Sequence, residues 1–174
     1  MIEMPTRIVH WPDPVLTRPA VAVASFDEDL RALAGRMVEL MHAAKGVGLA
    51  APQVGAGLRL FVCNPAGRPD DEQVYVNPRI VEADGLVEAD EGCLSLPGVQ
   101  VTTRRAARCR ITAQDLDGQP TDALGEELLA RVFQHEIDHL DGRLLLDLMS
   151  PAEKIANRRA VRQMREAYAT PASR

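Results

Sequence analysis

The sequence predicts an α+β fold, with antiparallel β-sheets packed around a central helix and further helices towards the two ends of the chain. Three observations predict it. One amphipathic helical pattern comes early, short β-prone runs separated by turn residues fill the middle, and two further helical patterns follow. Strands and helices segregated along the chain in this way are typical of the α+β class.

The N-terminal helix is expected after Ser25. Ser25 and Glu28 have the spacing of a capping box, in which each side chain binds a backbone N–H at the helix start. Apolar residues then recur at spacings of three and four until Gly46 ends the pattern. They are Leu30, Leu33, Ala34, Met37, Val38 and Met41. We interpret this stripe as a face that packs on the core.

A glycine-rich segment, residues 46–57, comes next. It is interrupted by Pro52 and suits neither a long helix nor a central strand, so we expect a tight loop whose backbone can approach a ligand. Turn residues such as Asn77-Pro78 and Asp117-Gly118 then separate short β-prone runs, which predict antiparallel sheet. The runs cover residues 58–63, 73–76, 86–88, 99–103 and 108–114.

Two helices are expected in the last third of the chain. Apolar residues keep helical spacing from about residue 125 to residue 140, and Gly142 is expected to end that helix in the left-handed conformation. Pro151 and Glu153 complete a capping box with Ser150 and predict a basic C-terminal helix over about residues 150–174. Because no repeat or linker interrupts the pattern, we expect one domain.

Composition and charge exclude several classes of protein. Of the 174 residues, 46% are hydrophobic and 26% charged, which argues against disorder. No apolar run reaches the roughly 20 residues of a membrane span, and the start lacks a signal-peptide pattern, so we expect a cytoplasmic protein that does not bind membranes. Residues 1–149 are strongly acidic, which argues against DNA binding, whereas the tail is basic.

The run His135-Glu136-Ile137-Asp138-His139 carries the clearest chemical signal. Two imidazoles four residues apart on a helix lie on one face about 6 Å from each other, so both can bind one metal ion while Glu136 stays free as a base. A solvated surface helix is the alternative. Two of the four histidines of the chain fall in this one turn, which favours the metal site.

A catalytic metal site needs a third protein ligand. Leu145 stands where the metzincin pattern requires a histidine, which excludes that family. A downstream carboxylate, Glu153 or Glu166, would make the site thermolysin-like, but both lie in the basic tail. Cys93 is the stronger candidate because Gly92 lets the backbone come close to a metal. Taken alone, such a cysteine is more often a small buried apolar residue.

Three separated motifs resemble those of the peptide deformylases, metalloenzymes that remove the formyl group from the N-terminal methionine of new bacterial and organellar proteins. The motifs are Gly46-Val47-Gly48-Leu49-Ala50-Ala51-Pro52-Gln53, Glu91-Gly92-Cys93-Leu94-Ser95 and Gln134-His135-Glu136-Ile137-Asp138-His139. Their order and approximate spacing also fit, and the weaker opening Pro12-Asp13-Pro14-Val15-Leu16 resembles the start of the family. The resemblance covers roughly residues 5 to 150.

The resemblance implies that Cys93, His135 and His139 hold one divalent metal ion, often ferrous iron in the cell, with zinc, nickel or cobalt able to occupy the site. It implies that a metal-bound hydroxide attacks the formyl carbon while Glu136 acts as general base and then general acid. Formate is then released. Residues 1–174 are accordingly expected to form a single catalytic domain.

The family assigns the oxyanion donors to the side-chain amide of Gln53 and the backbone N–H of Leu94. Asp138 is expected to orient a ligand imidazole or else to be solvated.

Substrate-binding residues follow less directly. Leu128 and Val132 share a helical face with His135 and, with Val47, line an apolar slot for methionine or belong to the core. The backbone of Gly46 and Gly48 resembles the part of the family that aligns the peptide like an added strand.

N-formylmethionyl nascent peptides are the expected substrates, and the basic C-terminal helix either contacts the ribosome or is a solvated face. Two other functions stay open. One is a thermolysin-like metallopeptidase that uses a downstream glutamate. The other is a metal-binding or ribosome-associated protein without turnover, against which Gln53 and Glu136 argue, because a mere binder needs neither an oxyanion donor nor a proton carrier.

Overall fold

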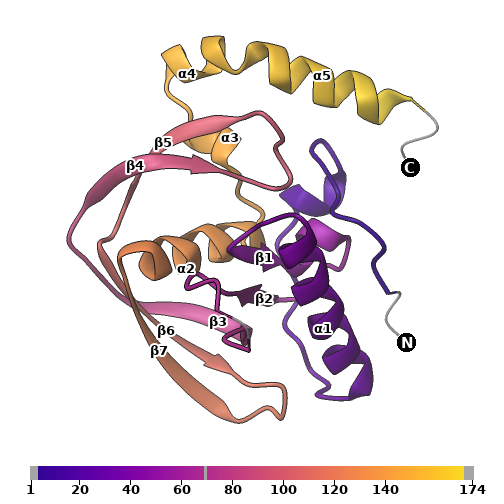
Figure 1. Ribbon diagram of the computed structural model, residues 1–174, viewed down its shortest axis with the longest axis vertical. Coiled ribbons are helices and arrows are strands. Elements are labelled where there is room, and N and C mark those ends of the chain that lie inside the picture. The colour runs from indigo at the N-terminus through magenta and orange to yellow at the C-terminus, as the bar shows by residue number, and fades with distance from the viewer. Residues whose placement is uncertain (1–3, 69, 171–174) are drawn as a thin grey trace.

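The structure is a computed structural model that describes residues 4–68 and 70–170. It has the expected α+β class, with two antiparallel sheets and helices before, between and after them (Figure 1). The larger sheet has five strands in the order β1-β2-β3-β6-β7, and the smaller one pairs β4 with β5. The strands are β1 (Gly48–Ala50), β2 (Leu60–Cys63), β3 (Gln73–Asp84), β4 (Val87–Gly92), β5 (Gln100–Arg105), β6 (Arg108–Gln114) and β7 (Pro120–Glu126).

The helix α1 (Glu28–Ala43) buries the predicted apolar stripe, except that Val38 is only partly covered. The predicted cap was wrong. Asp27, not Ser25, is the N-cap, and its carboxylate accepts a hydrogen bond of 3.1 Å from the backbone N–H of Leu30. Asp27 has the extended backbone that an N-cap requires and directly precedes the first helical residue, so its side chain reaches the free N–H groups.

The glycine-rich segment is more regular than the predicted loop. Gly48–Ala50 forms the edge strand β1, which pairs with β2, and a 3₁₀ helix, η2 (Ala51–Val54), follows. Gly55 ends this helix at φ +86°, a conformation that glycine adopts without strain. The expectation that this segment is no central strand is confirmed, because β1 lies at the edge of the sheet.

Two boundaries in the sheet differ from the prediction. Asn77-Pro78 does not end a strand: β3 continues to Asp84, and a bulge between Val76 and Arg79 absorbs the proline. The strand β7 was missed, and the helix predicted from residue 125 begins at Glu127. Seven residue pairs with β6 hold β7 in place, across the predicted Asp117-Gly118 turn, where Gly118 has φ +79°.

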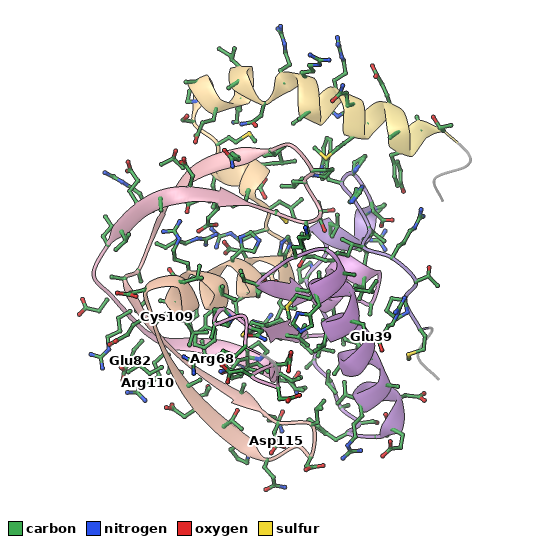
Figure 2. The ribbon with its side chains drawn as sticks, in the orientation of Figure 1. Glu39, Arg68, Glu82, Cys109, Arg110 and Asp115 are labelled. Atoms are coloured by element: carbon green, nitrogen blue, oxygen red, sulfur yellow. The ribbon has the colours of Figure 1, made fainter. Side chains whose placement is uncertain are left out.

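The helix α2 (Glu127–Leu140) lies between the five-stranded sheet and the two-stranded one, which we call the β4–β5 ribbon (Figure 1). Its apolar face packs on β2, β3 and β6 in one core cluster, and Gly142 follows it at φ +74°, as predicted. The outer face of the large sheet carries ion pairs, such as that of Arg110 on β6 with Glu82 on β3, whose Nε and Oε2 atoms are 3.3 Å apart at the outside of the molecule (Figure 2).

The C-terminal part is broken into three helices rather than one. They are α3 (Leu145–Leu148), α4 (Pro151–Ala156) and α5 (Arg158–Ala169). The predicted capping box of Ser150 and Glu153 is confirmed at the start of α4. Asn157 separates α4 from α5, and its side-chain amide binds the backbone of Gln100 on β5, so these helices are anchored to the ribbon.

Candidate metal centre

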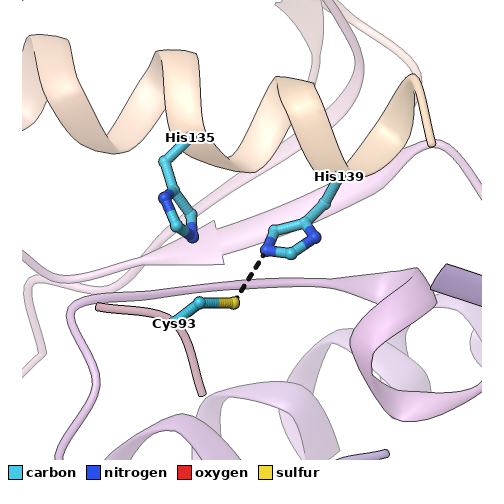
Figure 3. Close-up of side chains that lie close together, drawn as sticks. All are labelled: Cys93, His135 and His139. Carbon is cyan, nitrogen blue, oxygen red and sulfur yellow. Dashed lines mark hydrogen bonds between the residues drawn. The ribbon is translucent and has the colours of Figure 1, made fainter. Parts of the chain in front are cut away.

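Three side chains from two distant parts of the chain converge beside α2. His135 and His139 project from the same face of the helix with their ring centroids 5.0 Å apart, and Cys93 follows directly after β4 (Figure 3). Cys93 Sγ lies 3.2 Å from His139 Nε2. One potential ligand atom from each of the three residues lies within 4.8 Å of the others. In the part of the chain that the structure describes, this is the one group of its kind.

The donor set fits a divalent transition metal. Thiolate sulfur and imidazole nitrogen are the ligands that zinc and related ions prefer, and three protein ligands leave one position of a tetrahedral site open. The structure does not bring Glu153 or Glu166 into this group. The Glu153 carboxylate accepts hydrogen bonds from Ser150 and from the backbone of Thr102 instead, so nothing supports a thermolysin-like ligand set.

Glu136 is buried next to the candidate ligands. Its Oε2 atom has no hydrogen-bond partner among the described residues. Burial raises the pKa of Glu136 to about 7, and the nearby Glu91 carboxylate acts in the same direction, against the opposing effect of His135. A carboxyl group with a pKa near neutrality can both accept and return a proton, which is the property a general base needs.

Gln53 places its amide beside Cys93. It lies on η2, and its Oε1 accepts a hydrogen bond of 2.8 Å from the backbone N–H of Ala50. That contact orients Nε2 to within 3.5 Å of Cys93 Sγ and 3.3 Å of Ser95 Oγ. The N–H of Leu94, next along the chain, forms no hydrogen bond within the described residues and is therefore available to a ligand.

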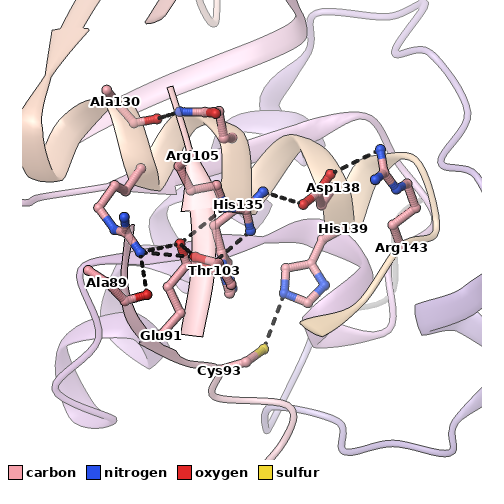
Figure 4. Close-up of polar contacts among 12 residues, drawn as sticks. Ala89, Glu91, Cys93, Thr103, Arg105, Ala130, His135, Asp138, His139 and Arg143 are labelled. Atoms are coloured by element: carbon pink, nitrogen blue, oxygen red, sulfur yellow. Dashed lines mark hydrogen bonds and ion pairs between the residues drawn. The ribbon is translucent and has the colours of Figure 1, made fainter. Parts of the chain in front are cut away.

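Glu91, rather than Asp138, orients a candidate ligand. Glu91 Oε2 lies 3.1 Å from His135 Nδ1, whereas Asp138 pairs with Arg105 at 2.5 Å and with Arg143 at 3.5 Å (Figure 4). The expectation for Asp138 was therefore wrong. The Asp138 carboxylate is bound by Arg105 and Arg143 instead of by an imidazole.

The carboxylate of Glu91 is stabilised in its charged form. Burial alone would raise the pKa of Glu91, but hydrogen bonds from His135 and Arg105 outweigh it and hold the pKa well below its usual range. A charged acceptor fixed at Nδ1 leaves Nε2 of His135 free to face a metal ion.

A cavity of about 910 Å³ opens onto the candidate metal centre. All five residues expected to bind substrate line it, namely Gly46, Val47, Gly48, Leu128 and Val132. Cys93, Gln53 and Glu136 line it as well. A side chain at Gly48 would overlap Glu136 Oε1, so this glycine lets the backbone approach the carboxylate.

Sequence reasoning missed several lining residues, among them Arg131 and two residues of the C-terminal helices. Arg131 lies on α2 four residues before His135 and so shares a helical face with it, as Leu128 does at seven residues, so Arg131 could have been found. Glu153 and Asn157 come from the C-terminal helices, and no local signal places those helices at the cavity mouth.

Comparison with known proteins identifies the family. A family model described as polypeptide deformylase matches residues 5–155. The chain belongs to this family. A peptide deformylase of Acidobacterium capsulatum is 46% identical over 162 residues, covering 92% of this chain and 95% of the relative. A chloroplastic and mitochondrial peptide deformylase 1B of Arabidopsis thaliana is 44% identical over 85% of this chain and 55% of its own length.

Solved structures of peptide deformylases share the fold. A plant peptide deformylase PDF1B superposes with a TM-score of 0.91 at 39% identity, covering 97% of this chain and 93% of the other. The enzyme of Legionella pneumophila gives a TM-score of 0.88 at 41% identity, with 97% and 100% covered. The chain is thus a hydrolase of a metalloenzyme family that removes the N-terminal formyl group from nascent peptides. No helix in the described ranges is long and apolar enough to cross a membrane.

Proposed function

We propose that the chain deformylates N-formylmethionyl peptides with one divalent metal ion held by Cys93, His135 and His139. The convergence of these three side chains beside a cavity that Cys93, His135 and Glu136 line supports the proposal most strongly. When bound, such an ion supplies Lewis acidity, polarising the formyl oxygen and lowering the pKa of water towards neutrality. Ferrous iron is proposed for the cell, with zinc, nickel and cobalt as substitutes that suit the same sulfur and nitrogen donors.

Glu136 carries the proton. It accepts a proton from the attacking water as the water oxygen bonds to the formyl carbon, and it returns that proton to the methionine nitrogen as the carbon–nitrogen bond breaks. Formic acid and an amine result, and they leave as formate and an ammonium group, so atoms and protons balance. Burial and the absence of a hydrogen-bond partner on Oε2 among the described residues support this role.

Gln53 and Leu94 stabilise the oxygen on which negative charge develops. The Nε2 amide of Gln53 and the backbone N–H of Leu94 flank Cys93, and both can donate to one oxygen beside it. Such donors lower the energy of the transition state because the charge is larger there than in the substrate.

Leu128, Val132 and Val47 supply the apolar wall for the methionine side chain, whose unbranched thioether adapts to such a slot. Gly48 on the edge strand β1 and Gly46 just before it offer backbone groups to the peptide.

The function is tested by formate release from formyl-Met-Ala-Ser with anaerobically purified protein. Wild type should release formate, and Glu136→Gln should bind the same amount of metal with little turnover. Cys93→Ala separates the proposal from a thermolysin-like peptidase, because it should abolish metal loading here and spare a site built on a downstream glutamate. Wild-type activity in Cys93→Ala would reject the proposed ligand set.

The basic face of α4 and α5 is proposed to contact ribosomal RNA. Its exposed cations are Lys154, Arg158, Arg159, Arg162 and Arg165. Arg158 and Arg159 lie outside the deformylase cavity, so Arg158→Glu with Arg159→Glu should abolish co-sedimentation with ribosomes and leave formate release intact. Unchanged co-sedimentation would contradict the contact and leave a solvated face.

A further inference from the structure

The candidate ligands sit on two separate units. His135 and His139 belong to α2, which packs on the five-stranded sheet. Cys93 directly follows β4, in the loop that joins the two strands of the β4–β5 ribbon, and this ribbon forms its own sheet. The apolar side of the ribbon packs on the C-terminal helices. Val101 on β5 and Leu96 in the β4–β5 loop belong to one core cluster with Leu145, Met149 and Met164. What joins the ribbon to α2 therefore bears on where Cys93 stands relative to the imidazoles.

Arg131 is one of several residues that make that junction, beside the contacts of His135 with Glu91 and of Gln134 with the backbone of Ala106. Arg131 lies one helical turn before His135 and its side chain is 13% exposed. Its Nη2 atom donates to three acceptors, all on the ribbon: Ala89 O at 3.0 Å, Glu91 Oε1 at 2.9 Å and Thr103 Oγ1 at 3.0 Å. Its Nη1 atom has no partner in the described part of the chain, so the hydrogen bonds that the guanidinium makes there all run from α2 to the ribbon.

Glu91, which accepts a hydrogen bond from Arg131, also orients His135. Glu91 Oε1 also accepts hydrogen bonds from Thr103 Oγ1 and Arg105 Nε, while Oε2 contacts His135 Nδ1. Arg105 is itself on the ribbon and, among the described residues, hydrogen-bonds to α2 through Asp138. Arg131 reaches from α2 to Glu91 on the ribbon, and Arg105 reaches from the ribbon to Asp138 on α2, each across a largely buried contact where screening by water is weak.

We propose that Arg131 is a positioning residue that fastens the β4–β5 ribbon to α2, so that Cys93, His135 and His139 stand in register before an ion binds. The proposal rests on the proposed function, because it takes those three residues as the ligands. A lysine is a poor replacement for Arg131, since one ammonium cannot reproduce the planar spread of donors of a guanidinium.

The test measures metal affinity rather than activity. Cobalt binding to metal-free Arg131→Met is followed through the thiolate-to-cobalt absorption and by competition with a chelator. Loss of an outer partner of a metal site typically weakens affinity about 10- to 100-fold, and we expect a loss in that range, with Arg131→Lys intermediate. Arg104→Met is the matched control, because Arg104 is 71% exposed and pairs with Glu88 within the ribbon.

Each alternative has its own outcome. Wild-type cobalt affinity and absorption in Arg131→Met would overturn the proposal. This holds even if the metal-free variant melts at a lower temperature, because a lower melting temperature with normal cobalt binding indicates a structural role alone. A raised KM with unchanged cobalt affinity would instead assign Arg131 to direct substrate contact and also overturn it. Cys93→Ala in the same assay checks the ligand set. If Cys93→Ala keeps the wild-type cobalt affinity, the proposed function fails. If Cys93→Ala loses cobalt but Arg131→Met keeps the wild-type affinity, only the inference about Arg131 fails.

Discussion

The backbone of Gly48 lies directly against the carboxylate of Glu136, with no room for a side chain between them. A Cβ atom at residue 48 would overlap Glu136 Oε1 and stand 3.0 Å from Val132 Cγ1. The edge strand that is proposed to bind the peptide therefore also sets the position of the proposed proton carrier.

Gly48→Ala is expected to lower kcat sharply, because it displaces the Glu136 carboxylate. A displacement of about 1 Å in a catalytic group can cost on the order of 100-fold in rate. Formate release at saturating substrate measures the effect. Gly35→Ala is the control: nothing lies within 4 Å of its new Cβ on α1, so it should keep full activity and gain about 0.5–1 kcal/mol in the free energy of unfolding. Equal kcat in the two variants would contradict the prediction.

Gln53→Ala should reduce kcat by a factor of about 10² to 10³, the usual effect of removing one oxyanion donor, with little change in KM. The reason is that the Gln53 amide flanks Cys93, where the developing charge is expected. Steady-state kinetics with formyl-Met-Ala-Ser measures both parameters. Gln119→Ala, at an exposed hairpin position, should behave as wild type. A rise in KM alone for Gln53→Ala would make the residue a binding group.

The three cysteines should differ in reactivity. Cys63 and Cys109 are fully buried, and burial raises the pKa of both thiols, whereas Cys93 is partly exposed. A raised thiol pKa means a smaller thiolate fraction at a given pH, so these two buried thiols should react slowly with the reagent. Native metal-free protein should therefore show one fast thiol in a disulfide-exchange titration, and zinc should slow it. Two fast thiols in the native protein would contradict the described burial.

The cap of α1 can be tested with two single substitutions. Asp27→Ala should lower the free energy of unfolding by about 1 kcal/mol, because it removes the acceptor of the Leu30 N–H, and Ser25→Ala should leave it unchanged. Chemical denaturation of both variants measures this. The reverse order of stabilities would restore Ser25 as the cap.

Local patterns predicted the parts of the fold that neighbouring residues determine. The apolar spacing of α1 and α2, the Asp117-Gly118 turn and the Ser150 capping box each act over a few residues, and each is found. The strand β7 was missed because Pro120–Glu126 contains one β-branched residue, Thr121, and owes its conformation to pairing with β6. Asn77-Pro78 misled because a bulge accommodates it within β3.

The candidate site needed more than local patterns. Helical spacing alone brings His135 and His139 together, but Cys93 is 46 residues from His139. The need for a third ligand made Cys93 a candidate, and the resemblance of three motifs implied that the three residues meet. The partner of His135 shows the same limit. Asp138 is close in sequence, yet Glu91, 44 residues away, makes the contact, because Arg105 binds the nearer carboxylate.

The central claim is that one sulfur and two imidazole nitrogens bind the same ion. X-ray absorption spectroscopy of the protein loaded with one equivalent of zinc tests it most directly. The account predicts one sulfur at about 2.3 Å and two imidazole nitrogens at about 2.0–2.1 Å, with the sulfur lost in Cys93→Ala. A wild-type spectrum with nitrogen and oxygen neighbours but no sulfur would contradict it.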